Sequence, residues 1–75
     1  MARWAKQSIV VHKTSGLTRD KAKEIARPYA DRLYTARETG ESFRFRQLPP
    51  SKFERGSFRT KHMSGRVAII EGKLK

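Results

Sequence analysis

Glu41-Ser-Phe-Arg-Phe-Arg-Gln-Leu48 is the stretch that decides the fold class of this chain, and Gly56-Ser-Phe-Arg-Thr-Lys-His62 shows a related alternation. Because phenylalanine and arginine alternate, a β-strand would place aromatic side chains on one face and cations on the other. The pattern predicts a sheet with one face in the core and one face offered to a polyanion. It indicates binding rather than catalysis.

The chain has 75 residues, of which 36% are hydrophobic, so it fits one domain (residues 1–75) with a thin core. A domain of this size buries only about 60% of the surface of its unfolded chain. Each large apolar side chain is therefore needed in the core, and we expect Phe43, Phe45 and Phe58 to be buried. Burial is also the expectation for Trp4.

The formal net charge is +11, from 18 Lys and Arg against 7 Asp and Glu. This excess predicts attraction to an anionic partner, most commonly nucleic acid, with a membrane surface or an acidic protein surface as the alternatives. No cysteine is present, which excludes disulfides and thiolate metal sites and fits a cytoplasmic location in a bacterial or host cell. No segment has the apolar run of a signal peptide or a membrane span, so we expect no membrane partner.

A β-branched run predicts the first strand over residues 8–13, extended at its start by residues 3–6. A short helix over residues 2–11 is the less favoured alternative. A helix is predicted next, with Thr18 as N-cap and Gly40 as C-terminal stop. Pro28 predicts a kink, or two short helices that meet there. Apolar residues at intervals of three and four mark the buried stripe of this helix: Ala22, Ile25, Ala26, Tyr29, Ala30, Leu33 and Ala36.

Three strands follow in the prediction. The Phe43/Phe45 strand ends at Pro49-Pro50, and residues 57–62 and 66–71 form a hairpin around residues 63–65. The second hairpin strand is apolar on both faces, which predicts an interior position in the sheet. The predicted fold is α+β: a single small β-α-β-β-β domain with one kinked helix packed on a three- to four-stranded, largely antiparallel sheet.

Seven cations form the candidate surface for backbone phosphates, and arginine predominates among them because its planar fork matches phosphate oxygens. If the arginines of the Phe43/Phe45 strand share a sheet face with those of the next strand, the cluster would follow a phosphate backbone. The alternative is a set of solvated charges on an ordinary exposed face. The residues are Arg44, Arg46, Lys52, Arg55, Arg59, Lys61 and Arg66.

Phe53 lies alone between Lys52 and Arg55 in a proline-bounded loop, which makes it the candidate aromatic for stacking on a base. The alternative is that it folds back onto the core.

Signals for chemistry are weak. His12 and His62 have no neighbours at metal-ligand spacing, and the serines lack an evident base and orienting acid. Glu71-Gly72-Lys73 matches half of a metal-dependent nuclease site, without the upstream acid that would share the metal. We therefore expect no catalytic residues, metal or cofactor, and a protein that is not an enzyme.

Three segments together resemble small proteins encoded by phages and other mobile elements: residues 43–53 (FRFRQLPPSKF), 56–61 (GSFRTK) and 69–75 (IIEGKLK). The resemblance covers roughly the C-terminal half. It implies a phage or prophage origin and an organised loop from Pro49 to Gly56, and it implies no activity.

The favoured hypothesis is a non-enzymatic nucleic-acid-binding protein, for DNA or RNA, that contacts mainly the phosphate backbone. One alternative is a small phage-type inhibitor or adaptor that binds an acidic surface of a host protein. Another is a structural component of a ribonucleoprotein or a virion. The oligomeric state stays open.

Overall fold

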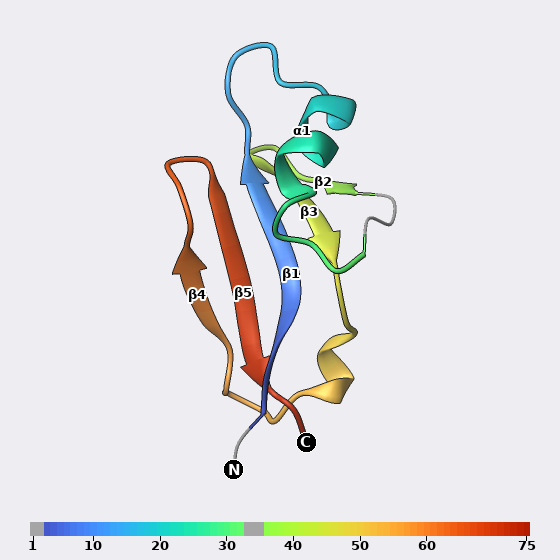
Figure 1. The fold of residues 1–75 in the computed structure, drawn as a ribbon, viewed down its shortest axis with the longest axis vertical. Coiled ribbons are helices and arrows are strands. Elements are labelled where there is room, and N and C mark those ends of the chain that lie inside the picture. The colour runs from blue at the N-terminus through green and yellow to red at the C-terminus, as the bar shows by residue number, and fades with distance from the viewer. Residues whose placement is uncertain (1–2, 33–35) are drawn as a thin grey trace.

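Strand β1 (Trp4–His12) is the middle strand of a five-stranded antiparallel sheet, in the order β2-β3-β1-β5-β4. The structure is a computed structural model and describes residues 3–32 and 36–75. One α-helix packs on one face of the sheet, so the predicted α+β class is confirmed (Figure 1). The other elements are α1 (Arg19–Ala26), β2 (Arg37–Glu38), β3 (Ser42–Arg46), a 3-10 turn (Pro50–Lys52), β4 (Arg59–His62) and β5 (Val67–Lys73).

The prediction of three or four strands was wrong, because it missed β2. This two-residue strand pairs Arg37 with Arg44 and Glu38 with Phe43. It lies where the sequence pattern predicted the end of the helix.

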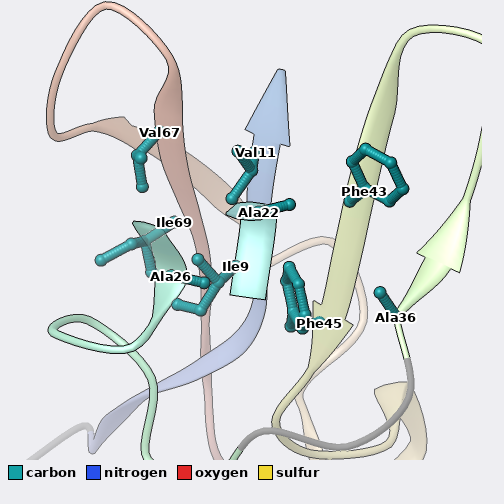
Figure 2. Packing of buried hydrophobic residues seen from close by; sticks show 9 residues of the cluster. All are labelled: Ile9, Val11, Ala22, Ala26, Ala36, Phe43, Phe45, Val67 and Ile69. Carbon is teal, nitrogen blue, oxygen red and sulfur yellow. The ribbon is translucent and has the colours of Figure 1, made fainter. Parts of the chain in front are cut away.

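The core lies between α1 and the inner residues of three adjacent strands (Figure 2). On β1, Ile9 pairs with Phe45 on one side and with Ile69 on the other. The aromatic side of the Phe/Arg alternation therefore does face the core, as predicted for Phe43 and Phe45. The cluster consists of Ile9, Val11, Ala22, Ala26, Ala36, Phe43, Phe45, Val67 and Ile69.

Helix α1 starts as predicted and ends much earlier. The Thr18 side chain accepts a hydrogen bond from the backbone N–H of Lys21, which satisfies one of the free donors of the first turn. The helix ends at Ala26 with Arg27 as C-cap, so the predicted continuation past Pro28 to Gly40 was wrong. Pro28 has no N–H and cannot donate the next helical hydrogen bond, to the carbonyl of Glu24, although Arg27 before it keeps a helical conformation. Leu33, predicted to belong to the apolar stripe, lies outside the described residues.

A buried amide, rather than a longer helix, holds the chain that follows α1. The side chain of Gln47 is 3% exposed and accepts hydrogen bonds from the N–H groups of Asp31 and Arg32, both at 2.8 Å. Its NH₂ group donates to the carbonyl oxygens of Arg32 at 2.8 Å and Phe45 at 3.1 Å. Gln47 therefore connects the segment after the helix to the end of β3.

Phe53, the candidate for stacking on a base, is 2% exposed, so the alternative that it folds back onto the core is confirmed. Phe58, predicted as core, is 42% exposed, so that prediction was wrong. The reason is Gly72 on β5: a Cβ at this position would lie 2.7 Å from Cδ1 of Phe53, so the ring occupies space that only glycine leaves free. The loop folds back through a β-bridge between Phe53 and Leu74. The expected burial of Trp4 was also wrong, since it is 37% exposed.

The β4–β5 hairpin is confirmed, with the N–H of Met63 donating to the carbonyl of Val67 at 2.9 Å. Strand β5 lies between β1 and β4, which confirms its interior position. No helix within residues 3–32 and 36–75 is long and apolar enough to cross a membrane.

Candidate functional site

The sheet face opposite α1 is here called the open face. Side chains alternate between the two faces, so the strand register assigns each one. One row across the open face joins Arg37 to Arg44, then passes through β1 and β5 to His62. The strand residues of the open face are Arg37, Ser42, Arg44, Arg46, Ala5, Ser8, Val10, His12, Ala68, Ile70, Gly72, Thr60 and His62.

Cations without carboxylates occupy the β2–β3 side of this face. Arg37, Arg44 and Arg46 are exposed, and within the described part of the chain none of them forms an ion pair. Both strand carboxylates, Glu38 and Glu71, point to the α1 side. The strands of the open face therefore present positive charge that no strand carboxylate on the same face neutralises.

The opposite face shows how the carboxylates are used. Glu38 accepts hydrogen bonds from Lys13 at 2.7 Å and from Arg19 at 3.4 Å. The hydrogen bond from Lys13 and its charge, with a smaller contribution from Arg19, lower the pKa of Glu38 below its ordinary value of 4.5. Glu71 accepts a hydrogen bond from Arg59 at 3.3 Å. The cations in these ion pairs all lie on the α1 side of the sheet.

Arg37 and Arg44 are directly opposite each other on neighbouring antiparallel strands. Directly paired side chains have Cβ atoms about 4.5–5.5 Å apart, and like charges in this position destabilise a sheet. A bound anion would remove the repulsion. Two arginine forks side by side also offer donors in the geometry that phosphate oxygens accept.

A shallow depression of about 480 Å³ adjoins Arg44 on the open face. Its polar wall comes from the β2–β3 turn and could receive a sugar or phosphate group beside the arginine. Glu41, in the same turn, is a carboxylate at this depression and reduces its positive potential. The lining residues are Val10, His12, Thr39, Gly40, Glu41, Ser42 and Arg44.

Arg59 and Lys61 lie on the other face of the sheet from Arg44 and Arg46. Lys61 pairs with Ile69, which faces the core, and Arg59 pairs with Glu71. The guanidinium of Arg59 lies 3.7 Å from the ring centroid of Trp4, a cation–π contact that holds it on the α1 side. The condition for a continuous cluster, a shared face for the four cations, is therefore not met.

The three remaining predicted cations lie at the ends of the sheet. Lys52 and Arg55 are exposed in the loop at the end where both termini lie, and Arg66 is exposed just before β5 at the opposite end (Figure 1). Of the predicted site residues, the structure brings only Arg44 and Arg46 together on the open face. Phe53 is removed from the site by its burial.

Sequence reasoning missed two residues of this surface, Arg37 and Phe58. Arg37 fell within the predicted helix, although Thr39-Gly40-Glu41 before an alternating strand is a composition typical of a hairpin turn. Phe58 could not be identified, because its exposure depends on Phe53 filling the space over Gly72.

No group of three or more His, Asp or Glu in the described residues is placed to hold a metal ion. Comparison with protein-family models, curated proteins and solved structures gives no match for this chain.

Proposed function

We propose that this protein binds nucleic acid through the open face and that it does so without catalysis. The observation that carries the proposal is the carboxylate-free row of Arg37, Arg44 and Arg46, exposed and outside any ion pair of the described residues. A net charge of +11 adds long-range attraction to any polyanion. Contacts of this kind go to phosphates, so binding is mainly electrostatic and weakly sequence-specific.

The double variant Arg44→Gln/Arg46→Gln tests the proposal. Affinity for a labelled oligonucleotide is measured by fluorescence anisotropy over a salt series. Log affinity should fall linearly with log salt, and the loss of two phosphate contacts should reduce the slope by about 1.4 for a single strand or about 1.8 for a duplex.

Arg19→Gln/Arg27→Gln is the matched control, because it removes the same charge from α1 on the other side of the sheet. Both of these arginines form exposed ion pairs with glutamates, which contribute little to stability. Equal losses of affinity in the two double variants would refute a site on the open face. Affinity that does not change with salt would refute the proposal as a whole.

An adaptor that binds an acidic host protein is the second candidate, and Trp4 is the observation that favours it. Its half-exposed ring lies against Arg59 and has the ammonium of Lys73 5.5 Å from its centroid, an arrangement suited to an interface anchor. Pull-down from nuclease-treated lysate distinguishes the candidates. Retention of one stoichiometric protein, lost on Trp4→Ala, would favour the adaptor, whereas loss of all partners after nuclease would favour nucleic acid.

A further inference from the structure

Phe58 is an exposed aromatic side chain at the edge of the open face. Its Cδ1 atom lies 3.1 Å from the position of a Cβ at Gly72, and Gly72 follows the open-face residue Ile70 by two positions. The buried ring of Phe53 supports it, with 5.4 Å between centroids and an interplanar angle of 58°. The ring is thus held in place from one side and remains partly open to solvent.

The strands between Phe58 and the arginines carry no charged side chain on the open face. The strand positions between them carry small, apolar and hydroxyl side chains: Ser8, Val10 and Ala68, which are buried, Ile70, which is half-buried, and Thr60, which is exposed. From β4 to β3 there are three strand spacings, or about 14 Å. A ligand that touches both Phe58 and the arginine row must therefore be extended, with a planar apolar group at one end and negative charge at the other.

We infer that the open face binds single-stranded nucleic acid, with an unpaired base stacked on Phe58 and the backbone phosphates at Arg46, Arg44 and Arg37. The inference rests on the proposed function and names its ligand more closely. A duplex keeps the faces of its bases stacked on one another, so it could use the arginines but not the ring. A single strand exposes base faces that an aromatic side chain can stack on whatever the sequence.

The alternative, insertion into a duplex groove, finds weaker support in the described elements. A helix in the major groove needs free donors along one side. On α1, Arg19 and Arg27 are instead paired with carboxylates, and Asp20 adds a negative charge beside the two lysines that form no ion pair among the described residues, Lys21 and Lys23. Binding of a duplex as tightly as a single strand would contradict the inference.

The test measures anisotropy with labelled oligothymidylate, oligouridylate and a duplex, each of about ten residues, within the site sizes of about 4–16 nucleotides known for small single-strand binders. Phe58→Leu removes the aromatic face and keeps apolar bulk, whereas Phe58→Tyr keeps the ring. Trp4→Leu is the matched control, since it removes a comparably exposed aromatic side chain on the α1 side of the sheet. The two single strands show whether DNA and RNA are both accepted.

We expect wild type to prefer both single strands to the duplex. Phe58→Leu should weaken single-strand binding about five- to 150-fold, which corresponds to about 1–3 kcal/mol for one stacked base, and leave duplex binding unchanged. Phe58→Tyr and Trp4→Leu should stay within about threefold of wild type, because both leave a ring at position 58. Circular dichroism checks that each variant is folded.

The outcomes separate this inference from the proposed function. Equal binding of duplex and single strand, or unchanged single-strand binding in folded Phe58→Leu, would overturn the inference, and the proposed function would survive if Arg44→Gln/Arg46→Gln still lowered affinity. If Phe58→Leu fails to fold, the strand preference of wild type and the behaviour of Phe58→Tyr decide. Wild type that binds no oligonucleotide at low salt would overturn both.

Discussion

Gly72→Ala should destabilise this protein, although the same change in a strand ordinarily stabilises. Glycine in a strand interior costs roughly 0.5–1 kcal/mol relative to alanine, because it loses more conformational freedom on folding. The φ of Gly72 is not in the left-handed region, so alanine meets no backbone strain there. Without a neighbour, the substitution would therefore be favourable.

The neighbour is Phe53. The new methyl group would lie 2.7 Å from Cδ1 and 3.1 Å from Cγ of this ring, and 3.1 Å from Cδ1 of Phe58. The Phe53 ring is buried between its own loop and Gly72 of β5, so it cannot move away from the new methyl group as the end of a flexible surface side chain could. Overpacking of this kind costs typically about 1–3 kcal/mol. After subtraction of the alanine gain, a net loss of up to about 2.5 kcal/mol remains, with about 1 kcal/mol near the middle of the range, or about 4–8 °C in Tm for each kcal/mol.

Urea unfolding followed by the fluorescence of Trp4, the single tryptophan, measures this loss. Gly40→Ala is the control, because nothing lies within 4 Å of its Cβ position and its φ is not positive. In a Phe53→Val background, which lacks the Cδ1 atom, Gly72→Ala should become neutral or stabilising. Wild-type stability or better in Gly72→Ala, or an equal loss in both backgrounds, would refute the account of why Phe53 is buried and Phe58 exposed.

Three further predictions concern the buried side chain of Gln47, the ion pairs on the α1 side of the sheet and the arginines of the open face. Gln47→Ala should lower the free energy of unfolding by about 2–4 kcal/mol, because it removes four hydrogen bonds to backbone groups, including those of Arg32. Each buried group left without a partner costs about 1–3 kcal/mol. A loss below about 0.5 kcal/mol in urea unfolding would contradict this role of Gln47. The pKa of Glu38 is lowered in the folded protein, so its contribution to stability is present at neutral pH and is lost as the pH falls below 4.5. The difference in Tm between wild type and Glu38→Gln should therefore shrink as the pH falls through that range. A difference in Tm that stays constant would argue against a stabilising role of the ion pairs of Glu38. Arg37→Gln should raise stability by about 0.2–1 kcal/mol by relieving its repulsion with Arg44, and should weaken oligonucleotide binding; destabilisation would show that the arginine is structural.

The sequence sufficed for the parts of the fold that follow from local pattern. The period-2 alternation around Phe43 and Phe45 identified a strand and the face that it buries, and the β-branched run identified β1. Thr18 identified the start of the helix. In each case a residue and its near neighbours carry the physical reason.

The rest depends on contacts between distant segments. Apolar residues at helical spacing predicted a helix that ends at Gly40, whereas the chain after Pro28 is held by Gln47, which follows β3. Strand β2 exists because β3 offers it a pairing edge. The burial of Phe53, with Phe58 left exposed beside it, depends on the space that Gly72 leaves free because it has no side chain. The spacing of hydrophobic residues in the sequence cannot show which of two nearby phenylalanines, Phe53 or Phe58, is buried in that space.

The open face is the place where this sequence departs from what stability alone would favour. Elsewhere the charges agree with the fold: Glu38 neutralises Lys13 and Arg19 on the α1 side, and Glu71 neutralises Arg59. Among the described strands, only β2 and β3 set two arginines directly opposite each other, next to a third and with no strand carboxylate on that face. A sequence that had only to fold could replace one of them by a neutral residue at no cost, so this repulsion supports the proposed anionic ligand, which would compensate it. The predicted opposite signs of Arg37→Gln, a gain in stability and a loss in binding, are the direct consequence of this reasoning.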